Sequence, residues 1–377
     1  MEWGEGLESL SHVQVAGFRL HRHHLFCRAS LKSLAGVVRD VVGVQAQFMS
    51  AAQLALWARV EGVTQRDVTE CLWRKRSLVK TWCMRGALHL LAAVDLPVCI
   101  GGLFQSGLRR ERKWLAKYGV SQAEAEAMIE AVVEVLDDEV LTRKELAQRV
   151  AAVLGGKTKR WVEHSWGGIV KLACLQGLVC FGPNRGKEIT FVQYNRWLPR
   201  VKEMTVEEAE ETLLRRYLHG YGPADMRDFA AWSGMTVKEA VQILMRLHSE
   251  VVEVEVEGKL GLALCEDLDE LQNTVLDDAS VCLLPSFDCF MLGHKDKSHL
   301  VAEAYYKRVY RKAGWLSPVV LVNGCVIGVW SHKRRGRRLH ITIELFKKIS
   351  RSIRKRIDKE AKSLARFFDT TCEVTFV

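Results

Sequence analysis

Two glutamines with one residue between them, Gln45 and Gln47, stand directly before a segment with a helical pattern. Each amide offers a carbonyl acceptor and an NH₂ donor, so two converging amides can hold and orient one water molecule. Residues i and i+2 share one side of an extended segment but point to nearly opposite sides of a helix. The amides can therefore meet on one small group only if they precede the helix. Taken alone, the pair is better explained as serving backbone groups before a helix.

A capping pattern predicts where that helix starts. Ser50 is followed three residues later by Gln53, which is the spacing of a capping box, in which each side chain satisfies the other residue's backbone N–H. The pattern predicts a helix that begins near Ala51 and runs to Arg59. Both glutamines then lie outside the helix, where they can face the same side.

The ionisable residues elsewhere in the sequence do not form a known catalytic motif. The sequence has no Ser-His-Asp order, Walker loop, His-Glu-x-x-His motif or nucleotide-binding glycine fingerprint. Asp288 lies between two apolar segments that carry phenylalanines, and it is predicted to be a turn or cap carboxylate rather than a general base. His89, on the inner strand of a predicted hairpin, is interpreted as a structural residue.

A cluster of histidines near the amino end could in principle indicate a metal site. His21, His23 and His24 follow Arg19, but no Cys or carboxylate cluster at ligand spacing lies nearby. We expect these histidines to lie at the surface or to face phosphate. The sequence therefore predicts no metal and no cofactor.

Composition bounds the class of protein. The 377 residues, 48% hydrophobic and 27% charged, can bury a core large enough for two or three domains. The first residues lack the basic and apolar regions of a signal peptide, and no apolar run reaches the roughly 18 residues of a membrane span. We therefore expect a cytoplasmic, nucleoid-associated protein without a membrane partner. Eleven cysteines without a Cys-x-x-Cys pair indicate buried thiols rather than disulfides or a zinc ribbon.

The net charge of +10 is concentrated near the carboxyl end. Residues 307–366 hold 18 Lys or Arg against 3 Asp or Glu, and the rest of the chain is slightly acidic. Such a segment favours a polyanionic partner, because each neutralised phosphate releases condensed counterions. A solvated basic helix would explain the charge equally well.

Three times along the chain, predicted helices are followed by a predicted β-hairpin, at 77–91, 178–192 and 251–264. The units recur at a spacing of roughly 75 to 85 residues, a repeat in pattern rather than in identical residues. Three short helices and a hairpin describe a winged helix-turn-helix, whose third helix commonly enters the major groove. Helix caps are predicted at Thr64, Ser121, Thr142, Thr205 and Thr236. Hairpin turns are expected at Arg85-Gly86, Gly182–Gly186 and Glu257-Gly258, and the third helix of the second unit is expected from about Trp161 to Gly177.

The carboxyl-terminal part is predicted to hold a twisted β element and a long basic helix from about Phe346 to Phe368. One hairpin there has a cationic tip around Gly336, which suits a groove lined with phosphates. A solubilising loop would have the same composition. The tip cations are Lys333, Arg334, Arg335, Arg337 and Arg338.

The predicted fold class is α+β and mostly helical, with three tandem winged helix-turn-helix units and a carboxyl-terminal β-rich element. The first unit, 1–118, contains the glutamine pair. The second unit spans 119–200, the third spans 201–275, and the β-rich element with the basic hairpin and helix spans 276–377.

Six segments, at 45–47, 54–59, 82–89, 177–183, 216–224 and 284–288, together resemble the bacterial AlkZ-type DNA glycosylases of the YcaQ-like winged-helix superfamily. The resemblance spans nearly the whole chain and implies three winged-helix units that form a C-shaped, DNA-binding channel. It also implies that Gln45 and Gln47 are catalytic, because the family's Gln-hydrophobic-Gln motif is assigned to catalysis. YcaQ-like relatives have Asp at the second position, so Gln47 places this chain on the AlkZ side. Ala87 departs from the expected Thr, which affects a secondary contact.

Two amides without a general acid cannot protonate a departing base, so they can catalyse its removal only if the base is already a good leaving group. An N7-alkylated purine is cationic and can leave the sugar without protonation, so its N-glycosidic bond is the implied target. A water held by Gln45 and Gln47 would attack C1′ as an oxocarbenium-like centre develops. No lysine is singled out for Schiff-base chemistry, so we predict a monofunctional glycosylase that leaves an abasic site.

The expected partner is double-stranded DNA carrying alkylated purines, as bulky monoadducts or interstrand crosslinks, and the protein is expected to be a monomer. Arg85 and His89, near the glutamine pair, and the five tip cations are the predicted DNA contacts. The alternative is a non-enzymatic winged-helix transcriptional regulator that binds DNA, since a fold does not determine a function. A protein-interaction scaffold of degenerate winged helices is a third interpretation.

Overall fold

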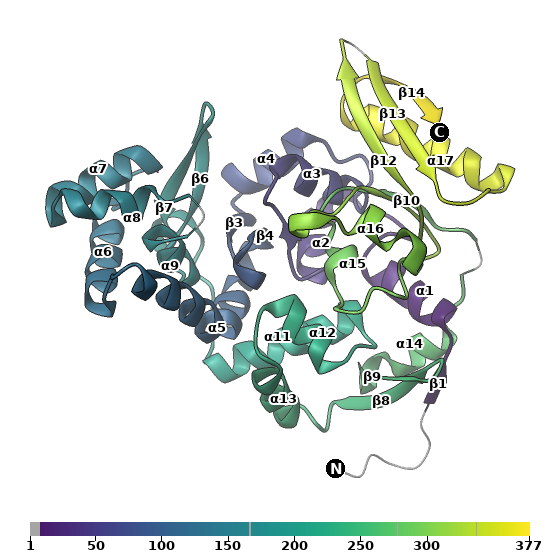
Figure 1. The fold of residues 1–377 in the computed structure, drawn as a ribbon, viewed down its shortest axis with the longest axis horizontal. Helices are drawn as coiled ribbons and strands as arrows, with labels where there is room; N and C mark the ends of the chain where they lie inside the picture. Colours follow the sequence, from purple (N-terminus) through teal and green to yellow (C-terminus); the bar gives the residue numbers. More distant parts are fainter. Residues whose placement is uncertain (1–7, 166, 277, 337) are drawn as a thin grey trace.

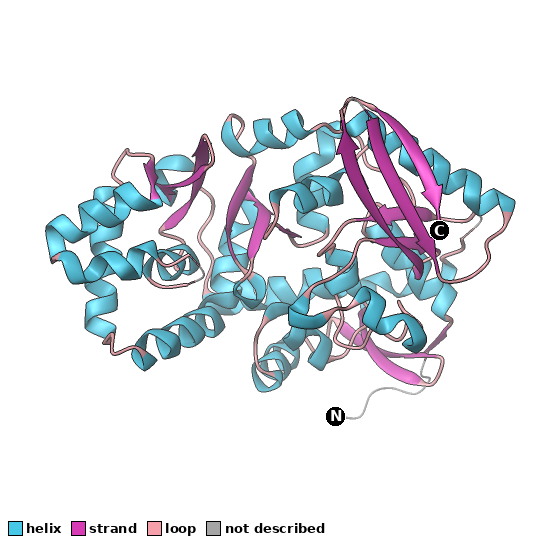
Figure 2. Ribbon diagram, turned by 45° about the horizontal axis from the view of Figure 1, so that its top comes forward, coloured by secondary structure: helices cyan, strands magenta, loops and turns pink. Residues whose placement is uncertain are grey.

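The computed structural model describes residues 8–165, 167–276, 278–336 and 338–377. The fold is mixed α/β, with about half of these residues in helices. Their strands form three sheets of three strands and one of five, and helices pack around each sheet (Figures 1 and 2). None of the described helices combines the length and apolarity that a bilayer crossing requires.

The first helical group surrounds a sheet with the strand order β2-β4-β3. Its elements are α2 (Leu34–Asp40), β2 (Val44–Gln45), α3 (Met49–Trp57), α4 (Gln65–Trp73), β3 (Leu78–Trp82) and β4 (Leu88–Ala92). A long helix, α5 (Leu96–Lys117), leads away from it to the second group. Both faces of the sheet are buried, because Leu78 and Leu90 belong to one hydrophobic core and Val79 and Leu91 belong to another.

The second group has the sheet order β5-β7-β6. Its elements are α6 (Gln122–Val135), β5 (Leu141–Thr142), α7 (Arg143–Leu154), α8 (Lys159–Glu163), α9 (Ile169–Leu175), β6 (Val179–Arg185), β7 (Glu188–Gln193) and the short α10 (Tyr194–Trp197). Figure 1 shows this group at one end of the long axis and the carboxyl-terminal sheet at the other.

The third group contains α11 (Val206–Tyr221), α12 (Met226–Ser233), α13 (Val237–Arg246), β8 (Val251–Val256) and β9 (Lys259–Leu264). An isolated bridge joins Ala224, after the first of these helices, to Leu262 in the second hairpin strand. In the other two groups, β2 and β5 likewise pair with the second strand of their hairpins. All three groups therefore share one connectivity.

The amino-terminal elements join the third group rather than the first. β1 (Glu8–Leu10) pairs in parallel with β8, and α1 (His12–Arg22) packs near α14 (Leu268–Asn273). Leu10, Val15 and Phe18 are buried with residues of the third group's hairpin.

The carboxyl-terminal sheet has the order β10-β11-β12-β13-β14. Its strands are β10 (Val281–Leu284), β11 (Val319–Val322), β12 (Cys325–Arg335), β13 (Arg338–Leu345) and β14 (Thr371–Phe376), with α15 (Cys289–Leu292) and α16 (Tyr306–Val309) between the first two and α17 (Arg351–Phe367) before the last. Its buried residues form one continuous core with those of α2, α3 and α4. The first helical group therefore packs against the carboxyl-terminal sheet.

All five helix caps predicted at Thr64, Ser121, Thr142, Thr205 and Thr236 are confirmed as capping boxes. The cap predicted at Ser50 is wrong. Helix α3 begins at Met49 after Phe48, whose backbone carbonyl accepts from the N–H groups of Ala51 and Ala52. The earlier start does not change the main inference, because both glutamines still precede the helix.

Three other boundaries differ from the predictions. The helix expected from Trp161 to Gly177 is broken into α8 and α9 by Gly168, whose φ is 78°. Strand β6 continues through Pro183 to Arg185, because a bulge between Gly182 and Arg185 absorbs the proline. The last helix begins at Arg351, and the N–H of Phe346 instead donates to the carbonyl of Ile327.

One predicted surface histidine is buried. His23 is 0% exposed and packs edge-to-face against Tyr221 and Phe290. It follows the end of α1, where the chain turns inward. Helical amphipathicity alone did not indicate this burial.

Candidate active site

Gln45 and Gln47 flank a buried residue at the edge of the first sheet. Gln45 ends β2 and stands opposite His89 of β4. Ala46 is fully buried and its N–H donates to the carbonyl of Leu88 across 2.7 Å, whereas both glutamines are half-buried. This alternation is that of extended backbone, so both amides lie on the partly exposed side.

Arg85 lies in the turn η2 (Met84–Gly86) between β3 and β4, with a left-handed φ of 56°. Its Nη2 donates to Oε1 of Gln45 across 3.0 Å, and its Nη1 donates to the backbone carbonyl of Trp232 in α12. Burial lowers the pKa of Arg85. Both terminal nitrogens of this predicted DNA contact are therefore engaged within the protein, where they join the glutamine pair to the third helical group.

The glutamine amides keep unused hydrogen-bonding capacity. An arginine only donates, so it must face the carbonyl oxygen of Gln45 and not its NH₂ group. Oε1 retains a second lone pair, and neither Nε2 of Gln45 nor the Gln47 amide bonds to any part of the chain that the structure describes. Together the two side chains can hold a water molecule.

His89 stands opposite Gln45 in the sheet as a neutral group. It is 2% exposed, and its Nδ1 and the carbonyl of Ala87 are 3.0 Å apart. Burial, with the nearby charge of Arg85, lowers the pKa of His89 to about 3. The imidazole therefore adds no positive charge to the site at neutral pH.

Asp288 caps α15 by accepting from the N–H of Phe290 across 3.0 Å, as the sequence predicted. Its carboxylate also accepts two hydrogen bonds from the guanidinium of Arg59, at 2.7 and 2.8 Å, and both side chains are 0% exposed. Sequence patterns did not indicate this ion pair, which links residues 229 positions apart.

Sequence patterns also did not predict a group of three aromatic rings, those of Phe48, Phe287 and Trp315, which we call the aromatic triad. Phe48 directly follows Gln47, and its ring lies 5.9 Å from that of Phe287 and 5.4 Å from that of Trp315. The rings of Phe287 and Trp315 are 5.2 Å apart. The position of Phe48 beside the motif was the only sequence signal for this cluster.

The cationic tip lies at the far end of the β12–β13 hairpin, which projects from the body of the protein in Figure 1. Lys333, Arg334 and Arg335 are exposed, and Arg338 lies 3.8 Å from Glu373. Arg337 lies outside the described residues. The tip therefore presents its charges to solvent on the longest hairpin of the carboxyl-terminal sheet.

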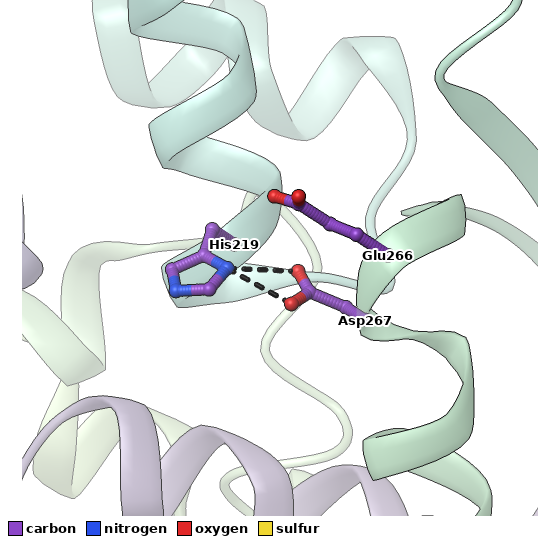
Figure 3. Close-up of side chains that lie close together, drawn as sticks. All are labelled: His219, Glu266 and Asp267. Atoms are coloured by element: carbon purple, nitrogen blue, oxygen red, sulfur yellow. Dashed lines mark hydrogen bonds and ion pairs between the residues drawn. The ribbon is translucent and has the colours of Figure 1, made fainter.

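His219, Glu266 and Asp267 offer atoms of metal-ligand type within 4.8 Å of one another (Figure 3). Asp267 is buried and already hydrogen-bonds to His219 at 2.9 Å and to Arg22 at 2.8 Å. The positive charge of Arg22 compensates the negative charge of this carboxylate. The group therefore ties α11 to α1 and to the segment that leads into α14.

Comparisons with known proteins give one consistent result. The model of the family "DNA glycosylase AlkZ-like" matches residues 38–367. A Streptomyces sahachiroi protein described as an interstrand DNA cross-link repair glycosylase is 32% identical over 367 residues, covering 94% of this chain and 95% of that protein. The solved structure of the Streptomyces sahachiroi DNA glycosylase AlkZ matches with a TM-score of 0.86 and 31% identity, over 98% of this chain and all of that one.

Proposed function

We propose a substrate and a mechanism for this chain, which belongs to the AlkZ-like DNA glycosylase family and is a DNA glycosylase. It hydrolyses the N-glycosidic bond of cationic N7-alkylated purines in duplex DNA and leaves an abasic site. Bulky monoadducts and interstrand crosslinks are both substrates, as the description of the Streptomyces sahachiroi relative suggests. No cofactor takes part in this mechanism, and the protein acts as a monomer.

The observation that carries the proposal is the Arg85–Gln45 hydrogen bond beside the unused Gln47 amide. Among the described residues, no carboxylate hydrogen-bonds to the side chain of Gln45, and His89 is neutral. Such a site supplies no acid to protonate a departing base. It therefore suits a base whose positive charge already makes it a good leaving group.

In the reaction, the bond between C1′ and the purine breaks, and its electron pair neutralises the cationic ring. Positive charge develops on the sugar, and a water held by Gln45 and Gln47 attacks C1′. The amide oxygens accept hydrogen bonds from this water, which loses a proton to solvent. Position and oriented dipoles supply the catalysis.

The shared connectivity of the three helical groups supports their assignment as winged-helix units at 1–118, 119–200 and 201–275, followed by the β-rich element at 276–377. Residues 8–22 differ from this division, because they pack with the third unit and not with the first. We infer that these units line a C-shaped DNA channel. The tip cations Lys333, Arg334, Arg335, Arg337 and Arg338 contact phosphates. Arg85 acts near the lesion by supporting Gln45, and His89 stands opposite Gln45 in the neighbouring strand.

Mass spectrometry of bases released from DNA treated with a nitrogen mustard tests this proposal. The wild type should release N7-alkylguanine, and a Gln45→Ala/Gln47→Ala variant should bind the DNA but release no base. Gln105→Ala, which removes an exposed amide from α5, is the matched control. Full activity of the double variant would contradict the proposed roles of the glutamines.

A further inference from the structure

We propose that the aromatic triad of Phe48, Phe287 and Trp315 binds the alkylated purine ring through stacking and cation–π contact. This inference rests on the proposed function and adds a binding site for the base to the site for the water. The triad thereby distinguishes a cationic purine from an ordinary one.

The triad is a group of three mutually packed rings, two of which are largely exposed. Every pair of its three rings lies within 5.9 Å, yet Phe48 is 46% exposed and Trp315 is 43% exposed. Single exposed apolar side chains are common, but contiguous exposed aromatic surface marks a binding site. Aromatic faces bind cations and stack on bases of any sequence.

The position of the triad matches the reaction. Phe48 is the residue after Gln47, and neighbouring Cα atoms are about 3.8 Å apart. The triad therefore lies directly beside the glutamine motif along the chain, although the side chains of Gln47 and Phe48 leave the extended backbone on opposite sides. The backbone carbonyl of Phe48 starts α3, so its side chain has no capping role.

The rigid segments around the triad hold its rings in place. Phe287 has a left-handed φ of 59°, which is unusual for a bulky residue. The next residue, Asp288, is fixed by the buried guanidinium of Arg59, which directly follows α3 and its cap. One ion pair therefore anchors Phe287 to the helix that Phe48 begins.

The third ring is fixed by a tight loop. The N–H of Arg311 donates to the carbonyl of Trp315 across 2.8 Å, and Tyr310 bridges to Leu316. Arg311 and Lys312 in this loop are exposed and form no ion pair with any residue in the described ranges. The aromatic surface therefore has a cationic rim, as expected for a site that meets DNA rather than an apolar protein surface.

Binding measured in the Gln45→Ala/Gln47→Ala background tests the inference without base removal. The probes are a duplex oligonucleotide with one N7-methylguanine and the same duplex without it. Adding Phe48→Leu or Trp315→Leu should weaken binding of the modified duplex by about tenfold, the scale of one stacking contact. Binding of the unmodified duplex should change less than about twofold, since phosphate contacts dominate it.

Two further variants sharpen the test. Trp315→Phe keeps a ring and should retain the preference for the modified duplex, whereas Tyr118→Leu removes an exposed ring from the end of α5 and should change nothing. An equal loss for both duplexes, or no loss in either leucine variant, would overturn the inference. Wild-type protein that releases no base would instead refute the proposed function, and the binding preference would still be measured.

Discussion

The guanidinium of Arg85 holds the amide oxygen of Gln45 at 3.0 Å while it also bonds to the backbone of α12. This contact fixes which way the amide faces, because an arginine cannot face an NH₂ group. It also couples the glutamine pair to the third helical group. The turn that carries Arg85 is therefore part of the site, and the arginine itself is half-buried.

Replacing Arg85 by methionine should slow base release by about 10- to 100-fold, the usual value of a hydrogen bond to a charged group. The amide of Gln45 would be free to rotate, so the effect should fall on the single-turnover rate more than on DNA affinity. Arg109→Met is the control, because Arg109 is an exposed cation paired with Glu239. A loss of affinity with an unchanged rate would show that Arg85 binds DNA instead.

Breaking the Arg59–Asp288 ion pair should destabilise the protein strongly. Asp288→Asn leaves a buried guanidinium without a counter-charge, which costs about 3–5 kcal/mol of unfolding free energy. Urea unfolding measures this loss. Glu250→Gln, which breaks the more exposed pair with Arg215, should cost less than about 1 kcal/mol. Equal losses in the two variants would contradict the structural importance of the buried pair.

Stability should fall in mild acid because burial keeps several histidines neutral. Burial lowers the pKa of His89 to about 3 and of His299 to about 2, and it holds the pKa of His23 and His294 well below the usual range. The pKa of a histidine in the unfolded chain is about 6.5. At a pH between the folded and the unfolded pKa, only the unfolded chain binds the proton, so the free energy of unfolding rises with pH in this window. Each such histidine contributes a slope of about 1.4 kcal/mol per pH unit. Tm should therefore decrease as the pH falls below about 6.5.

His23→Phe is the matched variant for this pH dependence. The imidazole lies 4.7 Å from the ring of Tyr221 and 5.1 Å from that of Phe290, so a phenyl ring fits the same packing. Thermal unfolding across this pH range should show a shallower dependence than in the wild type. An unchanged slope would mean that His23 does not contribute to acid sensitivity.

Neutralising the hairpin tip should weaken DNA binding and flatten its salt dependence. In a Lys333→Gln/Arg334→Gln/Arg335→Gln variant, the slope of log K against log salt should decrease by about one for each phosphate that the tip no longer neutralises. Fluorescence anisotropy with undamaged duplex measures this slope. Arg246→Gln should leave it unchanged, because Glu210 and Glu211 already pair with Arg246. A wild-type slope in the triple variant would identify the tip as a solubilising loop.

Local patterns predicted what depends on neighbours in the chain. The confirmed capping boxes, such as Thr142 with Glu145, satisfy backbone groups three residues apart. The hairpin turn at Glu257-Gly258 needs only a backbone that can adopt positive φ, which is 46° and 84° there. Local rules failed where a nonlocal contact or a bulge competed, as at Pro183, which remains in β6 because of the bulge.

The sequence by itself determined that Gln45 and Gln47 precede a helix and that no carboxylate stands within the glutamine motif itself. Only the tertiary structure decided that Arg85 faces Gln45, that Arg59 is buried with Asp288, and that Phe48 meets Phe287 and Trp315. The reason is physical. Spacing along the chain constrains contacts within a turn or a hairpin, whereas these partners are brought together by packing between segments as far as 229 residues apart.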